Sequence, residues 1–555
     1  MSGKAVLIVG GSLAGIQQAL EQAKTGNKVY LVEKFPTLIC ERIGVNGTYD
    51  PDNLFMSPML EEVKNNENIQ IITGAEVEKV AEADGKFKIK IKQRASRIID
   101  ELCDDCKACI AVCPVNLWDD ANEQLSLRTA IDTPCMGSGI YNIVKDDMPI
   151  CQATCPANLD IRSYLGLIAD GKFEESLAVI RQRLPFPGII GRICPHPCEQ
   201  KCNRGLQDEP LSICGLKRFV ADCELAEKDP KANVTAKAGT RPEKVAVVGG
   251  GPAGLTCAHD LAQLGYGVTI FEALPVLGGM LAVGIPDYRL PRELLEKEID
   301  VVRALGVAIK TDTRIGKDIT IDGLFKDGFK AMFIAVGAHD SQKLGIPGEE
   351  AEGVVDGVYF LRDVNLGQKV WVGENVAVIG GGNVAIDAAR CALRLGAKKV
   401  SIIYRRSRQE MPASEEEIDA AEEENIDIQY LVAPVEVVSS NNKVKALKCT
   451  KMELGEPDAS GRRRPVPVAG SEFDIELDMI IPAIGQVSDL SFLGDGSGVE
   501  TTKRNTIAAD AETLATTRPG VFTGGDAMTG PDIAIAAVAA GKRAAASIDN
   551  YLRGE

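Results

Sequence analysis

The amino-acid sequence predicts an α/β protein of 555 residues that is built from Rossmann-type domains. Three observations lead to this fold class. An apolar run that enters a glycine-rich turn occurs three times, each followed by a helix-like segment and a second apolar run. Glycine is abundant at 55 residues and aromatic residues make up 5%, a composition that suits nucleotide-binding sheets. Twelve of the 16 cysteines lie between Cys103 and Cys223, which predicts a separate cysteine-rich region.

Residues 1–98 are expected to form a partial Rossmann domain. A first strand enters the turn Gly10 to Gly15, and the next strand ends on the acidic residue Glu33. Ser12 stands where a dinucleotide fingerprint has its middle glycine, which crowds a pyrophosphate. A weak nucleotide site and an empty structural remnant are both open interpretations of this segment.

Residues 99–150 are expected to form a ferredoxin-type segment. Its cysteines follow the bacterial ferredoxin spacing C-x2-C-x2-C-x3-C-P, in which several thiolates converge on one cubane. A zinc ion is the alternative to an iron–sulfur cluster for these cysteines. The three short gaps between the cysteines and the proline that follows the last one favour a cubane over a single tetrahedral ion. The cysteines of this run are Cys103, Cys106, Cys109 and Cys113.

Residues 151–228 are expected to be helical, and residues 229–243 form a polar linker with two prolines. A second group of cysteines lies in this helical region. The pattern C-x3-C-P is followed some forty residues later by C-P-x2-C-x3-C. Its members are Cys151, Cys155, Cys194, Cys198 and Cys202.

A first complete dinucleotide-binding domain is expected from residues 244–365 and 480–555. Its strand feeds the full G-x-G-x-x-G pattern of Gly249, Gly251 and Gly254. These glycines permit the tight turn, the approach of the backbone to the pyrophosphate, and close packing of helix on strand. Glu272 ends the next strand, where it can hold a ribose hydroxyl.

A second dinucleotide-binding domain is expected at residues 366–479. Its turn has alanine as the last small residue, which the fingerprint permits. The following strand ends on basic rather than acidic residues, which favours NADPH over NADH because arginines pair with a 2′-phosphate. A solvated basic turn is the alternative. The candidate residues are Gly380, Gly382, Asn383, Ala385, Arg405 and Arg406.

Charge and hydropathy exclude several classes of partner. The net charge of −17 argues against nucleic acid. The most apolar stretch, 533–540, is too short to span a bilayer, and no signal peptide precedes the first strand. We therefore expect a cytoplasmic protein without membrane insertion, in which clustered cysteines bind metal rather than form disulfides.

Residues 151–555 resemble the small subunit of glutamate synthase and its relatives, a family of NADPH-dependent iron–sulfur flavoproteins. The resemblance rests on Gly191-Arg192-Ile193-Cys194-Pro195, Cys198-Glu199-x-x-Cys202, Gly278 to Leu281, Gly284 to Pro291, Tyr404-Arg405-Arg406, Glu410 to Ala413 and Gly524-Gly525-Asp526. It implies a flavoprotein with an FAD domain and an NAD(P) domain, preceded by a helical iron–sulfur domain. The middle fingerprint then binds FAD and the third binds NADPH, with NADH as a possible substitute. The implied FAD residues include, besides the glycines and Glu272 above, Ala253, Gly279, Met280, Leu281, Arg289, Gly525 and Asp526.

The family also carries two [4Fe-4S] clusters in its helical domain, but this sequence departs from the family's first cysteine run. Only the last two cysteines of that run remain, as Cys151 and Cys155. The resemblance therefore gives two to three clusters in the whole chain. One ligand set would be Cys155, Cys194 and Cys198 with Cys214 or a non-cysteine group, and the other Cys151 and Cys202 with a partner such as Cys135.

Residues 1–150 are similar to a different protein, the start of the HdrA subunit of heterodisulfide reductase. The glycine turn, the strand ending at Glu33 and the ferredoxin run after a β-meander match it. HdrA carries FAD, so Gly10, Gly15 and Glu33 are candidates for a second FAD site. The copy here stops before the rest of that domain.

Together these patterns predict an NAD(P)H:acceptor oxidoreductase subunit. Electrons are expected to move between NADPH, FAD and [4Fe-4S] clusters, to or from a partner redox subunit or ferredoxin in a hetero-oligomeric complex. Hydride transfer needs no catalytic side chain. The alternatives are the small subunit of glutamate synthase and a flavin-based electron-bifurcating subunit. A third hypothesis makes the first 150 residues only a docking module and cluster relay.

Overall fold

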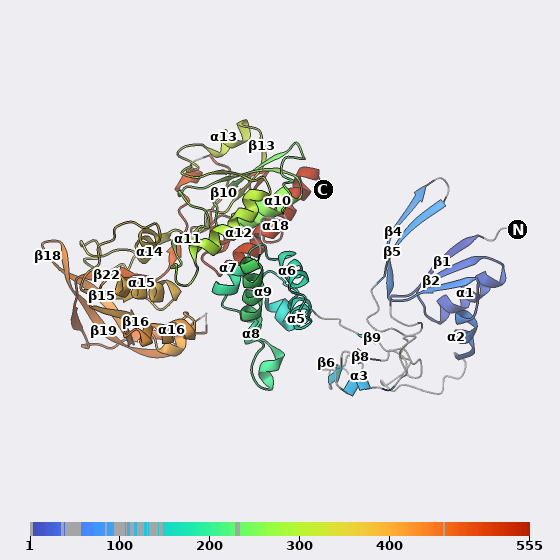
Figure 1. Ribbon diagram of the computed structural model, residues 1–555, viewed down its shortest axis with the longest axis horizontal. Helices are drawn as coiled ribbons and strands as arrows, with labels where there is room; N and C mark the ends of the chain where they lie inside the picture. The colour runs from blue at the N-terminus through green and yellow to red at the C-terminus, as the bar shows by residue number, and fades with distance from the viewer. Residues whose placement is uncertain are drawn as a thin grey trace. The chain divides into compact units, whose positions relative to one another are not determined.

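Figure 1 shows the computed structural model of the chain. The structure describes residues 4–34, 38, 57–83, 86–93, 106, 108–111, 116–118, 127–129, 131–132, 142–143, 148–227, 234–458, 461–494 and 496–554. The chain divides into two compact units, Met1–Met148 and Pro149–Glu555. Each unit is described by itself.

The first unit contains a small parallel sheet with strand order β1-β2-β3. Helix α1 packs on this sheet through Ile16, Ala19 and Leu20, which are buried against Val29 and Leu31. A long antiparallel hairpin, β4–β5, follows. The elements are β1 (Ala5–Val9), α1 (Leu13–Lys24), β2 (Lys28–Val32), α2 (Ser57–Lys64), β3 (Ile69–Ile72), β4 (Ala75–Ala83), β5 (Lys86–Gln93), α3 (Ala108–Ala111), β6 (Asn116–Trp118), β7 (Leu127–Thr129), β8 (Ile131–Asp132) and β9 (Asn142–Ile143).

The sheet of the first unit ends at β1, since no other described strand pairs with its free edge. Val9 on that strand is 65% exposed. The complete Rossmann sheet of the second unit covers the corresponding edge with two further strands. The described sheet of the first unit thus has three strands, which correspond to β10, β11 and β12 of that five-stranded sheet.

The second unit begins with a helical region whose short helices carry the cysteines near their ends. Helix α9 packs along α7 and also contacts α5, α6 and α8. The elements are α4 (Ile150–Thr154), α5 (Ile161–Ala169), α6 (Phe173–Arg181), α7 (Pro187–Ile193), α8 (Pro197–Gln200), η3 (Asn203–Leu206) and α9 (Ile213–Glu227). We call this region the helical cysteine domain.

The first dinucleotide domain is built on a five-stranded parallel sheet with order β12-β11-β10-β13-β24. Val245, Val247 and Phe333 face α10, α12 and α18, while Ala246 and Met332 face α13. In Figure 1 the three longer helices gather on one side of the sheet. The elements are β10 (Lys244–Val248), α10 (Pro252–Gln263), β11 (Gly267–Phe271), α11 (Met280–Val283), α12 (Arg292–Ala304), β12 (Ala308–Lys310), α13 (Ile321–Lys326), β13 (Phe329–Ile334), η5 (Ser491–Leu493), β24 (Val521–Thr523), α17 (Asp526–Thr529) and α18 (Ala534–Arg553).

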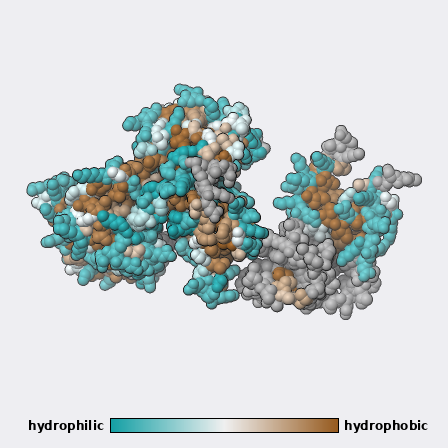
Figure 2. Space-filling model, in the orientation of Figure 1, coloured by the Kyte–Doolittle hydropathy of each residue, from teal (hydrophilic) through white to brown (hydrophobic). Residues whose placement is uncertain are grey.

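The second dinucleotide domain is inserted between strands of the first and has its own parallel sheet, β17-β16-β15-β22. The short antiparallel pair β14 (Asp340–Ser341) and β23 (Gln486–Val487) joins the two connections between the domains. In the view of Figure 2, hydrophilic residues cover most of the rim of this lobe. The other elements are α14 (Gly357–Asn365), β15 (Asn375–Ile379), α15 (Asn383–Arg394), β16 (Lys399–Tyr404), η4 (Arg408–Glu410), α16 (Glu415–Glu423), β17 (Asp427–Tyr430), β18 (Val432–Ser440), β19 (Lys443–Pro457), β20 (Arg463–Pro467), β21 (Phe473–Glu476) and β22 (Met479–Pro482).

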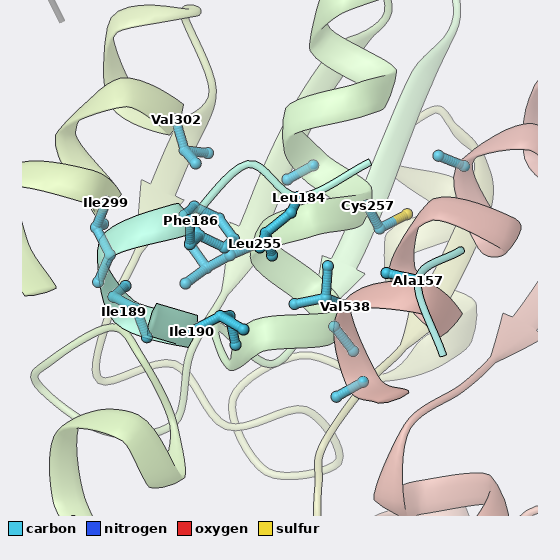
Figure 3. Close-up of a cluster of buried hydrophobic side chains, with 14 of the residues drawn as sticks. Ala157, Leu184, Phe186, Ile189, Ile190, Leu255, Cys257, Ile299, Val302 and Val538 are labelled. Carbon is cyan, nitrogen blue, oxygen red and sulfur yellow. The ribbon is translucent and has the colours of Figure 1, made fainter. Parts of the chain in front are cut away.

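The helical cysteine domain and the first dinucleotide domain share one hydrophobic core. Figure 3 shows Phe186, Ile189 and Ile190 at helix α7 packed among residues of α10, α12 and α18 such as Leu255 and Val538. All of these side chains are almost completely buried. This core fixes α7 on the dinucleotide domain.

A buried carboxylate reinforces the same contact. Glu298 on α12 is 2% exposed, and its two oxygens accept hydrogen bonds from the backbone N–H groups of Gly188 and Ile189, both at 2.8 Å. These N–H groups belong to the first turn of α7, which lacks intrahelical acceptors for them. Burial raises the pKa of Glu298 to about 7, against the opposing effects of these N–H groups and of Arg181 and Arg192.

Among the residues that the structure describes, no helix has both the length and the apolar character needed to cross a membrane.

Candidate functional site

A cavity of about 660 Å³ lies where three parts of the second unit meet. The glycine turn after β10 lines one wall, and the start of α15 with Pro412 lines another. Ile193 and Pro195 of the helical cysteine domain line a third. A cavity of this size, with backbone N–H groups and a few charged side chains, has the dimensions of a cofactor site.

The glycines after β10 have different structural roles. Gly249 has φ +104°, and a Cβ there would lie 2.3 Å from the carbonyl oxygen of Ala335. A Cβ on Gly254 would lie 2.0 Å from the carbonyl oxygen of Gly249. Gly251 has ordinary extended backbone angles, and its Cβ would meet only the Cα of Gly279, at 3.8 Å. Gly249 and Gly254 are therefore needed by the fold, whereas Gly251 leaves open space at the start of α10.

Two of the acidic residues that line this cavity, Glu272 and Asp526, were predicted from the sequence. Glu272 follows β11 and is 7% exposed; its carboxylate accepts from the N–H groups of Gly250 at 2.7 Å and Leu274 at 2.8 Å. Burial raises the pKa of Glu272, against the effect of these N–H groups. Asp526 at the start of α17 also lines the cavity, and burial raises its pKa to about 6. Each carboxylate keeps capacity to accept a hydrogen bond from a ligand hydroxyl.

The first turn of helix α18 also lines the cavity, through Ile533, Ala534 and Ala537. The N-terminus of this helix therefore opens on the site. The helix lies close to α10 because Gly541 faces the backbone of Ala253, where a Cβ would come within 2.3 Å of the carbonyl oxygen. A helix N-terminus offers unpaired N–H groups and a partial positive charge to an electron-rich ligand.

The glycine turn after β15 repeats the geometry of the turn after β10. Gly380 has φ +148°, and a Cβ there would lie 2.3 Å from the carbonyl oxygen of Ala483. Gly382 is extended, and its Cβ would approach only Pro412, at 3.9 Å. Asn383 begins α15, and Ala385 is completely buried behind it. The open position again lies at the N-terminus of a helix, where a pyrophosphate binds in such turns.

The two arginines after β16 differ in their surroundings. Arg406 is 6% exposed; its guanidinium donates to the carboxylate of Asp458 and to the carbonyl oxygen of Arg463, both at 2.8 Å. Arg405 is exposed and has none of these contacts. It lies at the carboxyl end of the strand, the edge at which ligands of parallel sheets bind. Arg406 therefore holds the β19–β20 hairpin, and Arg405 is the one available to a ligand.

Arg289 joins the two dinucleotide domains beside the cavity. Its guanidinium lies 2.7 Å from a carboxylate oxygen of Asp387 on α15 and 2.9 Å from one of Glu417 on α16. Burial, with help from Glu417, raises the pKa of Asp387 to about 7, although Arg289 opposes this. The guanidinium carbon of Arg390 lies 4.9 Å from the centre of the neighbouring Tyr288 ring. These contacts fix the angle between the domains.

Four cysteines of the helical cysteine domain come together around a small pocket. Cys155, Cys194 and Cys198 line it. The Cys214 thiol donates to the backbone carbonyl oxygen of Gly191 at 3.4 Å and lies beside the Cys194 thiol, where its proximity lowers the pKa of Cys194 to about 6. Burial raises the pKa of Cys198 to about 12. All four come from helix ends or first turns, so their thiols converge although the sequence separates them by up to sixty residues.

Cys151 and Cys202 form a second, smaller group. Burial, and to a lesser extent the neighbouring Cys202, raise the pKa of the Cys151 thiol. Within the described residues, no three Cys, His, Asp or Glu side chains converge tightly enough to hold a single metal ion. A cubane differs from a single ion because each of its four irons takes its own thiolate, so the ligands surround it rather than meet at one point.

The cysteine pocket lies directly beside the dinucleotide cavity. Ile193 and Pro195, the chain neighbours of Cys194, line the 660 Å³ cavity, while Cys194 itself lines the cysteine pocket. Ile535 of α18 lines the cysteine pocket from the dinucleotide domain. Consecutive residues of the chain therefore line the two sites.

The glycine turn of the first unit has the same form with one change. The backbone N–H of Gly11 donates to the carboxylate of Glu33, as that of Gly250 donates to Glu272. Gly10 has φ +106°, and a Cβ on Gly15 would lie 1.9 Å from the carbonyl oxygen of Gly10. Ser12 has the extended backbone angles of Gly251 but carries a side chain at that position.

The ferredoxin-type run is only partly described. Cys106 and Cys109 are exposed, and Cys109 lies in helix α3. Three cysteines predicted as ligands, Cys103, Cys113 and Cys135, lie outside the described residues.

Two family models match the second unit. The model described as pyridine nucleotide-disulphide oxidoreductase matches residues 243–541, which include both dinucleotide domains. The model described as dihydropyrimidine dehydrogenase domain II, 4Fe-4S cluster, matches residues 144–229, the helical cysteine domain. They confirm the predicted Rossmann-type flavoprotein fold, FAD and NADPH as the cofactors, and the iron–sulfur character of the cysteine domain. The number of clusters stays a prediction.

Individual proteins extend this likeness. The chain is 52% identical over 425 residues to the beta subunit of an NADP(+)-dependent formate dehydrogenase of Moorella thermoacetica, covering 73% of this chain and 60% of that one. It is 33% identical over 424 residues to the small chain of glutamate synthase [NADPH] of Escherichia coli, covering 73% of this chain and 89% of that one. The chain thus spans about three fifths of the length of the Moorella subunit.

A solved structure of an FprA variant from Mycobacterium tuberculosis shares the fold, with a TM-score of 0.50 at 18% identity over 57% of this chain and 85% of that one. The chain belongs to the pyridine nucleotide-disulphide oxidoreductase family, in the branch of NADPH oxidoreductases like the glutamate synthase small subunit.

Proposed function

We propose that the chain is the NADPH-oxidising subunit of a larger redox enzyme, exchanging electrons with a partner subunit or ferredoxin through FAD and [4Fe-4S] clusters. The observation that carries this proposal is the position of Cys194. Its two neighbours in the chain line the dinucleotide cavity, so an iron–sulfur ligand lies one residue from the flavin site. FAD accepts a hydride from NADPH and can release electrons singly, which is what a cluster requires.

The cavity residues hold the two nucleotides by backbone and carboxylate contacts. Gly251 and Gly382 leave room for the pyrophosphates at the starts of α10 and α15. Glu272 accepts from a ribose hydroxyl of FAD, and Asp526 accepts from the ribityl chain. Arg405 binds the 2′-phosphate of NADPH. The remaining FAD contacts are assigned to Gly249, Ala253, Gly254, Gly279, Met280, Leu281, Arg289 and Gly525, and the remaining NADPH contacts to Gly380, Asn383 and Ala385.

The cysteine pocket has the donor set of a [4Fe-4S] cluster. Cys155, Cys194, Cys198 and Cys214 supply four thiols, and the lowered pKa of Cys194 favours the thiolate form that binds iron. Cys151 and Cys202 are two ligands of a second cluster in this domain. Cys103, Cys106, Cys109 and Cys113 would hold a third cluster in the first unit.

The first unit is proposed as an HdrA-like segment that connects the reductase to its partner. The relatives named above are subunits of enzymes, which supports a hetero-oligomer, and the 52% identity to a formate dehydrogenase subunit favours an oxidoreductase partner over an amidotransferase. Electron bifurcation would need a second flavin. Ser12 at the position of Gly251 argues against one, so we assign this unit to cluster relay and docking.

Spectroscopy and dye reduction of the purified, reconstituted chain test this function. We expect about one FAD per chain, between 8 and 12 iron atoms for two to three cubanes, and reduction of a viologen dye by NADPH without a partner. Bleaching of the flavin band by NADPH should precede loss of the cluster absorbance. A chain that binds zinc in place of iron, or whose flavin does not react with NADPH, would contradict the proposal.

Replacing Arg405 by alanine is expected to weaken NADPH binding about tenfold or more, because a charge-assisted hydrogen bond to the 2′-phosphate is lost. The KM for NADH should change little, since NADH has no 2′-phosphate. Steady-state dye reduction with both nucleotides measures the two values.

Arg408→Ala is the matched control for that prediction. Arg408 lies in the same turn, but its guanidinium is held by Glu415, Asp419 and Glu422 of α16. This variant removes the same charge and should leave the KM for NADPH nearly unchanged. If both variants weaken NADPH equally, a diffuse positive field rather than Arg405 selects the nucleotide.

Replacing Cys106 and Cys109 by serine is expected to remove about four iron atoms per chain, because hydroxyls are poor ligands for a cubane. Reduction of FAD by NADPH should continue at its usual rate, while transfer to the physiological partner fails. Stopped-flow absorbance and a partner-linked assay measure the two steps. Loss of flavin reduction in a folded, iron-depleted variant would show that the segment lies between nucleotide and flavin.

A further inference from the structure

A buried lysine lies inside the cysteine pocket. Lys217 is on helix α9, three residues after Cys214, so the two side chains share one face of the helix. Lys217 is only 5% exposed and lines the pocket together with Cys155, Cys194 and Cys198. Lysine is rarely buried to this extent unless a negative group compensates its charge.

No carboxylate fulfils that role in the part of the chain that the structure describes. The structure gives Lys217 no ion pair and no side-chain hydrogen bond there. Glu199, a nearby acid, uses one oxygen to accept from the backbone N–H of Cys214 at 2.6 Å, and its other oxygen lies 3.8 Å from His196 Nε2. The groups that line the pocket together with the lysine include the thiols of Cys155, Cys194 and Cys198.

The position of this charge has a consequence for a bound cluster. Four thiolates give a [4Fe-4S] centre a net negative charge, and each electron that it accepts makes that charge larger. A fixed positive charge in a buried pocket stabilises the reduced form more than the oxidised form, because Coulomb interactions are strong where water is excluded. The net charge around a cluster is one of the factors that set its potential.

We infer that Lys217 acts as a positioning residue for electron transfer. Its charge raises the reduction potential of the cluster held by Cys155, Cys194, Cys198 and Cys214. The higher potential makes that cluster the first electron acceptor beside the flavin. This inference rests on the proposed function and adds a residue that acts on the cluster by its charge rather than by ligation. Lys217 would contribute only its charge when a bound cluster takes one electron from the reduced flavin.

The experiment compares Lys217→Met with Lys217→Arg in the full, reconstituted chain. Methionine keeps most of the length and apolar stem of lysine but removes the charge. We expect Lys217→Met to keep the iron and sulfide content and to lower the equilibrium constant for one-electron reduction about tenfold, a shift of about −59 mV in midpoint potential. Lys217→Arg should stay near the native value. Potentiometric titration followed by electron paramagnetic resonance measures the potential.

Lys172→Met is the control, because Lys172 is an exposed lysine of the same domain. The midpoint potential of the cluster in this variant should equal that of the native chain. An unchanged or higher potential in Lys217→Met overturns the inference. So does loss of the cluster in both Lys217→Met and Lys217→Gln but not in Lys217→Arg, since the charge then serves assembly. A native chain without iron in this pocket would instead overturn the proposed function.

Discussion

Replacing Gly251 by alanine is expected to reduce the flavin content of the purified chain from about one FAD to less than about a tenth, while the protein stays folded. The backbone of Gly251 already has angles that alanine adopts, and the new Cβ would meet only Gly279, at 3.8 Å. The methyl group therefore occupies space that the fold leaves open and that a pyrophosphate needs. Flavin absorbance after anaerobic reconstitution and circular dichroism of the apoprotein measure the two effects.

Two other glycine variants serve as comparisons for this prediction. Gly382→Ala places a methyl group in the equivalent open position after β15, where the nearest atom is 3.9 Å away, and should abolish reduction by NADPH while FAD content stays normal. Gly254→Ala drives a Cβ to 2.0 Å from a backbone oxygen and should lower the yield of folded protein. Normal flavin content in folded Gly251→Ala would mean that the FAD pyrophosphate lies elsewhere.

Replacing Glu298 by alanine is expected to lower the free energy of unfolding by about 2–5 kcal/mol. The change leaves two buried backbone N–H groups of α7 without acceptors, at a cost of about 1–3 kcal/mol each. Because α7 ends at Cys194, the variant should also lose iron from the cysteine pocket. Chemical denaturation and iron analysis measure both effects. Glu296→Ala on the same helix is the control: Glu296 is an exposed partner of Arg303 and should change stability by less than about 1 kcal/mol.

The same carboxylate makes a prediction about pH. Burial raises the pKa of Glu298 from its ordinary 4.5 to about 7, so the folded state holds the proton more tightly than the unfolded chain. Its contribution to stability is complete below pH 4.5 and is lost as the pH rises towards 7, by an amount on the order of 3 kcal/mol. In Glu298→Gln this loss cannot occur. The free energy of unfolding of that variant should therefore decline less between pH 5 and 7 than that of the native chain, and parallel curves would contradict the assignment.

Much of the fold could be predicted because its signals are local. The G-x-G-x-x-G pattern, the strand before it and the acidic residue after the next strand all lie within thirty residues, and the predicted Rossmann-type architecture is confirmed. The family resemblance likewise grouped Cys155, Cys194 and Cys198, and the structure places these three around one pocket. The assignment of these residues as ligands stays a prediction, as do the NADPH contacts.

The features that could not be predicted depend on contacts between distant segments. Glu298 lies 110 residues from Gly188, and no periodicity in either segment indicates that the two meet. Arg405 and Arg406 look equivalent in the sequence. They differ only because the β19–β20 hairpin, more than fifty residues later, supplies Asp458 as an acceptor for one of them. The burial of Lys217 could not be predicted from the sequence either, since the charged end of a lysine on an amphipathic helix usually stays in water.

The common core beneath α7 also determines how this protein can be divided. A fragment beginning at residue 234 would contain every residue that we propose to bind FAD or NADPH. The faces of α10, α12 and α18 that cover Phe186, Ile189 and Ile190 would, however, meet water in that fragment. Exposed apolar surface of that kind leads to aggregation rather than to a smaller working enzyme. A gene rearrangement that discards the cysteine helices would therefore destroy the dinucleotide domain as well. The dinucleotide domain and the helical cysteine domain of this chain therefore depend on one another for folding.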